Sequence, residues 1–448
     1  MADLEQLASD TVQVALAKGA SDAECTVAEG SEFSVTVRMG EVEQVKEAGS
    51  RAIGIRVLFG NRTGSAYTSD LSRDGVERMV AQAVELAAIT GDDPNTGLPD
   101  RAELGKFAGD LGLYHADTLA LPNAQRIEMA RRAERAALDA DPRVNNSEGG
   151  SFDSGDGHRV FANSRGFTGS YRYTSCSLSA VPVAKQNGSM ERDFWASSAR
   201  SPAKLEDPEY VGRKAAERVL RRLNPRKAPT QRCPVLFDTR MARSLVGHLF
   251  DAVNGTSIYR KSSFLVDKLG EVVASPLLNM IDDGTMPGLF GSGPFDDEGV
   301  ASRRTVIVGQ GRLENYLLNC YAARKLGMKT TGSATRGVSG NSGVGHGNLY
   351  FEAGATPEPE MIRGIANGLY VTELIGSGVN AVTGDYSRGA SGLWIENGEL
   401  AYPVSEITIA GNLKDMLRNI SAVGSELEFR GAVASPAILI GEMTISGQ

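Results

Sequence analysis

Residues 241–248 are where metal chemistry would be sought in this chain, and only one of them could bind a metal. They follow a short apolar segment, residues 234–237, and Asp238, a residue type that often starts a helix. A zinc-peptidase helix carries two histidines one turn apart, and a glutamate beside the first acts as general base. Here His248 is the one possible ligand, because the guanidinium of Arg243 is a permanent cation that cannot coordinate zinc. We expect His248 to be structural or superficial, since one imidazole without partners does not hold zinc tightly.

The remaining histidines and the grouped acids show no pattern with a defined chemistry. His115, His158 and His346 lie far apart and have no ligand spacing. The acidic groups at residues 282–283 and 296–298 could share a proton or bind a hard cation, although such groups are usually solvated loop charges. No Ser-His-Asp or Cys-His spacing is visible, but such triads form in space, so the sequence leaves them open.

A glycine-rich segment, residues 327–348, contains seven glycines among serine, threonine and asparagine. Backbone amides of such a loop can cradle an anion, but the segment lacks the G-x-x-x-x-G-K-S/T order of a nucleotide loop. A flexible loop that borders a groove is the better interpretation. The candidate loop residues are Gly327, Gly332, Gly340, Gly343, Gly345 and Gly347.

The elements that must position these residues begin with an α+β unit. Apolar residues at helical spacing predict a helix over residues 4–15, and Ser72 is a candidate cap for a second helix over residues 76–87. Between them, alternation predicts half-buried strands at residues 33–38 and 53–59. Residues 91–122, rich in Gly, Asp and Pro, are expected to form a long connector.

The middle of the chain predicts a helix over residues 124–140, and then short strands within residues 144–184, separated by turns such as residues 163–166. Asp207 followed by Pro208 predicts another helix start. Residues 224–229 have the composition of a linker. We therefore predict an α+β protein with an N-terminal α+β domain (1–90), a central helix and strand region (115–224) and a β-rich C-terminal domain (230–448).

Composition narrows the class of protein. The net charge of -8 argues against duplex DNA as a main partner, because phosphate binding requires a basic surface. The four cysteines form no C-x-x-C pair and are expected to be buried thiols in a reducing compartment. The N-terminus lacks the pattern of a secretion signal, and no run approaches the ~20 apolar residues of a membrane helix. We expect a cytoplasmic protein with no membrane partner.

Six sequence blocks, in order over roughly the last half of the chain, carry a resemblance to a known family. They are YRKSSFL (259–265), PFDDEG (294–299), YAARKLG (321–327), VTEL (371–374), TGDYSRGA (383–390) and YPVSEITIAGN (402–412). With them the chain resembles the TldD/PmbA family, and within it the PmbA (TldE) branch. The resemblance implies that the C-terminal domain has the fold of that family.

The resemblance also implies that the two types of subunit in the family have different roles. TldD-type subunits carry a His-Glu-three-residue-His helix and a late cysteine as third zinc ligand, whereas PmbA-type subunits lack these and pair with a TldD-type partner. In this chain Arg243 and Ser244 stand at the positions of the first His and the Glu, and no cysteine follows Cys320. The expectation is a non-catalytic subunit without catalytic residues, metal or cofactor of its own. Zinc is expected in the partner and unfolded peptides as substrates, with the loop at 327–348 as a mobile part of the substrate wall.

Two alternatives stay open. The chain could itself be a zinc metallopeptidase, as the family name suggests, although His248 alone provides too few ligands. It could also be a stand-alone homodimer that binds peptides or modulates DNA gyrase, a link that an older family label implies. Co-purification from the native host would separate this second alternative from a heterodimer.

Overall fold

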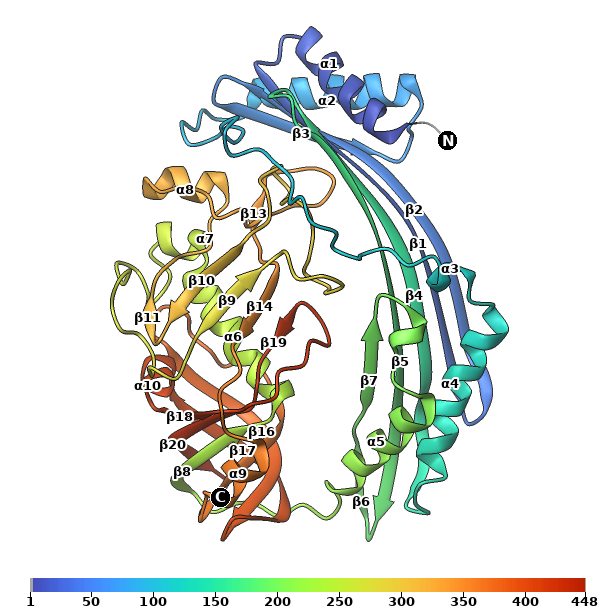
Figure 1. The fold of residues 1–448 in the computed structure, drawn as a ribbon, viewed down its shortest axis with the longest axis vertical. Coiled ribbons are helices and arrows are strands. Elements are labelled where there is room, and N and C mark those ends of the chain that lie inside the picture. Colours follow the sequence, from blue (N-terminus) through green and yellow to red (C-terminus); the bar gives the residue numbers. More distant parts are fainter. Residues whose placement is uncertain (1–2, 448) are drawn as a thin grey trace.

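The computed structural model describes residues 3–447 and contains a long curved sheet that lies beside a β-rich C-terminal body (Figure 1). The sheet has the strand order β3-β2-β1-β4-β5-β6, with β7 paired to β5, so it joins the N-terminal and central regions. Its strands are β1 (Asp22–Arg38), β2 (Glu41–Phe59), β3 (Arg62–Thr68), β4 (Val144–Asn163), β5 (Thr168–Gln186), β6 (Ser189–Arg192) and β7 (Trp195–Ala199).

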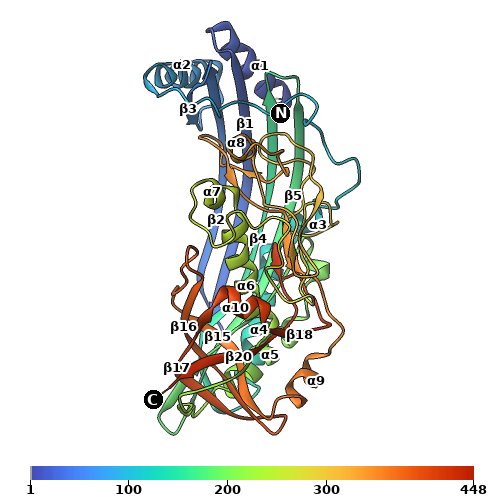
Figure 2. The ribbon, with the colours of Figure 1, turned by 90° about the vertical axis from the view of Figure 1, so that its left-hand side faces the viewer.

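The strands of this sheet are longer than their side-chain pattern suggests. β1, β2, β4 and β5 each contain 17 to 20 residues and run along most of the molecule (Figure 2). The prediction of short strands within residues 144–184 is therefore wrong, although the turn at residues 163–166 does separate β4 from β5. Pairing continues through polar and glycine residues because the backbone of each neighbouring strand supplies the hydrogen bonds. Ser31 opposite Asp156 is an example.

Four helices cover one face of the sheet. α1 (Leu4–Ala17) and α2 (Arg73–Ile89) pack near one end of its long strands. α4 (Asn123–Leu138) and α5 (Pro208–Leu220) pack towards the other end. Ser72 caps α2 and Asp207 caps α5, as the sequence predicts. The short α3 (Asp117–Ala120) and a 3₁₀ turn (Pro202–Lys204) complete these regions. Odd-numbered β1 residues such as Val27 and Phe33 face these helices, so the even-numbered residues face the C-terminal body.

The C-terminal body contains two main sheets, which confirms the predicted β-rich domain. In one of them β17 pairs with both β16 and β20, so that β17-β16-β15-β8-β20 closes into a barrel. Its strands are β8 (Gln231–Phe237), β15 (Asn367–Ile375), β16 (Asp385–Glu396), β17 (Glu399–Asn412), β18 (Ile420–Val423) and β20 (Ile438–Ser446). The other sheet contains β9 (Met280–Asp283), β10 (Arg304–Gly309), β11 (Arg312–Leu313), β14 (Asn348–Phe351) and β19 (Val433–Ala434). The pair β12 (Ala334–Thr335) and β13 (Gly343–Val344) lies apart from both.

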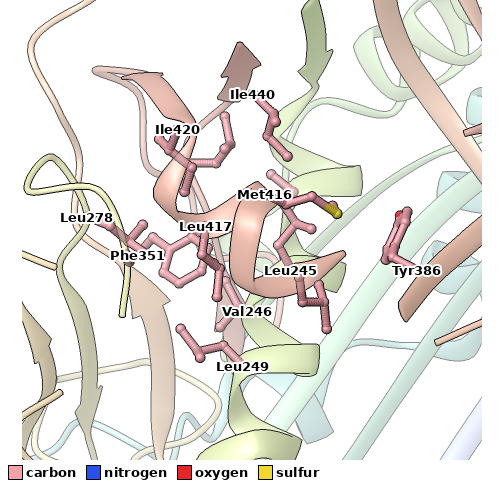
Figure 3. Close-up of a cluster of buried hydrophobic side chains, with 14 of the residues drawn as sticks. Leu245, Val246, Leu249, Leu278, Phe351, Tyr386, Met416, Leu417, Ile420 and Ile440 are labelled. Atoms are coloured by element: carbon pink, nitrogen blue, oxygen red, sulfur yellow. The ribbon is translucent and has the colours of Figure 1, made fainter. Parts of the chain in front are cut away.

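Short helices complete the C-terminal body around one longer helix, α6 (Thr239–Val253). Leu245, Val246 and Leu249 of α6 pack among buried side chains of β14 and of α10 (Leu413–Arg418), as Figure 3 shows. The remaining helices are α7 (Gly255–Tyr259), α8 (Cys320–Leu326) and α9 (Glu358–Arg363). The observed architecture is α+β, as predicted.

Two further expectations bear on the environment of the protein. All four cysteines are unpaired and buried. Within residues 3–447, no helix is both long enough and apolar enough to cross a membrane.

Candidate functional site

The helix α6 has one buried face and one face that carries the degenerate motif. Its start is fixed by Asp238, whose carboxylate accepts a hydrogen bond from the Met241 amide at 2.7 Å. Apolar residues at helical spacing form its buried face. The other face presents Arg243, Ser244 and His248, the three residues that the sequence singles out, and all three are only partly buried.

The side chains of Arg243 and Ser244 form hydrogen bonds to the backbone of α6 itself. The Arg243 Nε donates to the carbonyl oxygen of Arg240 at 3.3 Å, and the Ser244 hydroxyl donates to the carbonyl oxygen of Met241 at 2.7 Å. Burial lowers the pKa of the Arg243 guanidinium, with smaller effects from Asp238, which raises it, and Arg430, which lowers it. A guanidinium has no lone pair for a metal, and a serine hydroxyl is a far weaker base than a glutamate.

His248 is held by aromatic packing. Its ring lies edge-on to the Tyr386 ring at 5.9 Å between centroids, and its Nε2 has no hydrogen-bond partner among the described residues. Burial, with a smaller effect from the Arg388 charge, lowers the pKa of His248 to about 4. The imidazole is therefore neutral at neutral pH and lies beside a cation, which would also repel a metal ion.

The donor set on α6 does not fit zinc. Structural and catalytic zinc sites need at least three protein ligands drawn from His, Cys, Asp and Glu. Over residues 3–447 no three such side chains are grouped so that they could hold a metal ion. The α6 face of this chain therefore does not offer a zinc ligand set.

The acidic run at residues 296–298 is a structural junction, a role that sequence reasoning did not assign. Asp296 accepts from the amides of Glu298 and Val300 at 2.9 Å and of Ala334 at 3.0 Å, which ties its own turn to the glycine-rich segment. Asp297 pairs with Arg159 of β4 at 2.8 Å and accepts from the Arg336 amide at 2.6 Å. Asp297 thereby joins the curved sheet to the C-terminal body.

Glu298 ties the same acidic run to other parts of the C-terminal body. Its carboxylate accepts from the Cys320 amide at the start of α8 at 2.9 Å and from the Ser342 hydroxyl. Burial raises the pKa of Asp296, and the neighbouring Glu298 carboxylate raises it further.

The tip of the glycine-rich segment is docked on the sheet. Arg336 reaches β1 and pairs with Glu24, which also pairs with Arg56 of β2 at 2.7 Å. Arg56 Nε donates to Asn341 at 3.0 Å, and a side chain at Gly54 would collide with the Val338 carbonyl oxygen. The segment therefore bridges the C-terminal body and the sheet. Its flexibility stays a prediction.

The six glycines that the sequence selects have different roles. Gly327 ends α8 with a left-handed backbone at φ 65°, and Gly347 lies so close to Gly284 that no side chain would fit. Gly343 lines one cavity of about 350 Å³, and Gly332 and Gly347 line another of about 290 Å³. Gly340 and Gly345 line neither. Residues of the segment thus line both cavities, and its role as a loop that borders a substrate groove stays a prediction.

A third cavity, of about 410 Å³, lies on the sheet face opposite the helices. A row of directly paired residues crosses five strands there, β2, β1, β4, β5 and β7. Phe290 of the C-terminal body lines the same space. The row runs from Lys46 through Ser34, Asp153 and Ser177 to Ser198. Small hydroxyl side chains therefore dominate this wall.

Residues 230–447 match the PmbA/TldA metallopeptidase C-terminal domain, residues 117–223 its central domain and residues 23–87 its domain 1. The chain belongs to the PmbA/TldD metallopeptidase family. It is 45% identical over 446 residues to "Metalloprotease PmbA" of Escherichia coli O157:H7, covering 99% of this chain and 96% of that protein.

Two further relatives support the same assignment. A PmbA homologue of Haemophilus influenzae is 41% identical over 445 residues, with 99% of this chain and 96% of that protein covered. A crystal structure from Bacteroides thetaiotaomicron superposes with a TM-score of 0.93 at 28% identity and covers 100% of both chains. The name of that protein refers to modulation of DNA gyrase.

Proposed function

We propose that this PmbA-type chain is the non-catalytic subunit of a heterodimeric metalloprotease whose TldD-type partner holds the zinc ion. The observation that carries the proposal is the face of α6 with the degenerate motif, where Arg243 bonds to its own helix and His248 packs on Tyr386. Hydrolysis of a peptide needs a polarised carbonyl and an activated water. This face holds no ligand set for a metal that could do either, which supports a second subunit as the source of both.

The substrate class in this proposal is an unfolded peptide. An extended peptide exposes its backbone, and a sheet wall can receive it along its whole length. The row of serines around Ser34 and Ser177 presents small hydroxyl groups, which hydrogen-bond to a backbone without selecting bulky side chains. The long curved sheet thus forms a wall of the chamber in which the partner cleaves.

The competing function is peptide hydrolysis by this chain alone. The names of its relatives favour it, since they are called metalloproteases. The side chains on α6 count against it. Gyrase modulation has only the name of the Bacteroides thetaiotaomicron protein in its favour.

The test uses the purified chain, a TldD-type subunit from the same host, and the two together. Each sample is assayed for zinc after dialysis and for cleavage of an unfolded peptide. We expect zinc and cleavage only where the TldD-type subunit is present, with faster cleavage in the complex. About one tightly bound zinc ion in this chain alone, or cleavage by it alone, would overturn the proposal.

A further inference from the structure

A cavity of about 350 Å³ lies where the curved sheet, the connector and the C-terminal body meet. Three of the six sequence blocks contribute to it: Tyr259 and Arg260 from the first, Glu298 from the second and Tyr321 from the third. Arg56 of β2 closes it from the sheet side. Its size is near the lower end of the range for small-molecule sites. None of the residues on α6 lines it, so it is separate from the degenerate motif.

Arg260 brings a positive charge to this cavity. Its side chain is exposed and, within residues 3–447, has no ion pair or side-chain hydrogen bond, although its guanidinium lies over the Tyr259 ring at 5.8 Å from the centroid. Arg56, Arg159 and Arg336, in contrast, are all paired. Its position is set by the end of α7, where Lys261 adopts a left-handed backbone at φ 55°. Such a conformation is rare for a residue with a side chain and persists where the surroundings require it.

The other charged groups at the cavity are engaged elsewhere. Arg56 uses Nη1 for Glu24 and Nε for Asn341, so that its guanidinium is held in place beside the cavity. Both oxygens of Glu298 accept hydrogen bonds, one from the start of α8 and one from Ser342. The charge left free to meet a ligand is therefore positive.

Aromatic rings form the apolar side of the cavity. The Tyr259 and Tyr321 rings meet edge to face at 5.8 Å between centroids, at an interplanar angle of 72°. The Tyr321 hydroxyl donates to Asp93 of the connector at 2.7 Å, which fixes that ring. A ligand that fits has one anionic group for Arg260 and a short apolar part for the rings.

We propose that this cavity binds the C-terminal end of a peptide, with its carboxylate at Arg260 and its last side chain against Tyr259 and Tyr321. The proposal rests on the proposed function in so far as a peptide is the ligand. A chain-end carboxylate is planar and matches the fork of a guanidinium. Binding there would place the end of a chain between the sheet and the C-terminal body, beside the glycine-rich segment.

The test measures binding of one hexapeptide of glycine, serine and alanine with a final leucine, as the free acid and as the C-terminal amide. Calorimetry uses the full-length chain without a partner. The free acid should bind at least about tenfold more tightly than the amide, because the amide loses a charge-assisted hydrogen bond. In Arg260→Gln this difference should disappear, whereas Arg260→Lys should keep part of it. Arg73→Gln, an exposed arginine on α2, is the matched control and should keep all of it.

Equal affinity for acid and amide in the unchanged chain would overturn the proposal, as would a preference that persists in Arg260→Gln. Displacement of the peptide by inorganic phosphate at similar concentration would identify a general anion site and would also overturn it. The assay needs neither partner nor cleavage. A negative binding result would therefore leave the proposed non-catalytic role intact. Conversely, if that role were disproved, the binding result could still be interpreted.

Discussion

At the scale of single residues, the most consequential contact is Glu24 between two arginines. Its side chain is 1% exposed, and those of Arg336 and Arg56 are 2% and 8% exposed. Burial alone would raise the pKa of Glu24, but the charges of Arg336 and Arg56 outweigh it and hold the pKa below its usual value. One carboxylate thus compensates two guanidiniums far from bulk water.

Removal of the Glu24 carboxylate should destabilise the folded state. Glu24→Gln removes the carboxylate that is paired directly with both buried guanidiniums, which should lower the free energy of unfolding by about 3–5 kcal/mol. Urea unfolding checks this. Glu77→Gln, which breaks the exposed pair with Arg73, is the control and should cost at most ~1 kcal/mol. Equal effects of the two substitutions would contradict the buried-pair argument.

Asp282 should give the protein a measurable pH dependence. Burial, opposed by the Gly347 amide hydrogen bond and reinforced by Asp283, raises the pKa of Asp282 to about 7. The folded state therefore binds this proton more tightly than the unfolded chain does, whose aspartate pKa is ~4. The stability that this carboxyl contributes is present at low pH and is lost as the pH rises through about 7.

Asp282→Asn keeps an acceptor for the Gly347 amide but removes the titration. The free energy of unfolding of the unchanged chain, measured in urea at several pH values, should fall more steeply towards pH 7 than that of Asp282→Asn. Parallel curves for the two proteins would show that this carboxyl does not titrate in that range.

Introduction of His and Glu at positions 243 and 244 should not produce a working zinc site. In Arg243→His with Ser244→Glu, α6 gains one ligand and a base, but the third ligand is still missing and no group orients the new histidine. The double variant, purified alone, should hold no stoichiometric zinc and cleave peptides no faster than the same variant with His248→Ala. Zinc retention together with cleavage above that control would refute the argument.

At the scale of elements, the glycine-rich segment is the candidate for a mobile wall, although its tip is anchored. Shortening it between Arg336 and Asn341 keeps both anchors and reduces its reach. In the complex with a TldD-type subunit, we expect a higher KM for long peptides at unchanged zinc content. Steady-state kinetics with short and long peptides, and metal analysis, check this. Loss of zinc, or unchanged kinetics with every peptide, would remove the gating role.

The elements also show what a sequence can reveal. Ser72 and Asp207 mark helix starts correctly because capping is local, within three residues of the backbone that it serves. The lengths of β4 and β5 could not be predicted, because pairing with a neighbour and not side-chain alternation holds Gly155 and Gly157 in the strand. The cavity at Arg260 could not be predicted for a related reason: it joins segments far apart in the sequence, since Arg56 and Asn341 form a hydrogen bond across 285 residues.

At the scale of the whole molecule, the proposed heterodimer requires an extensive interface, and the C-terminal body offers apolar surface for it. Ile375, Val382 and Leu400 are 55%, 53% and 42% exposed. A permanent interface should bury more than ~2,000 Å² in total. Ile375→Glu with Val382→Glu should therefore weaken association with the TldD-type subunit, as seen by sedimentation. Ile89→Glu on α2, where the side chain is 83% exposed, should not. A complex unaffected by the double substitution would place the interface elsewhere.

The antiparallel pairing of β1 with β4 has a consequence for folding of the chain during its synthesis. β1 and β2 can form a hairpin as soon as they are made, but the other edge of β1 finds its partner only when residues such as Ala162, opposite Cys25, have been synthesised. At ~5–20 residues per second, that delay is on the order of ten seconds. During this time a long strand edge is open to pairing with other chains. Yield of the folded protein should therefore depend on translation speed and on chaperones that shield this edge.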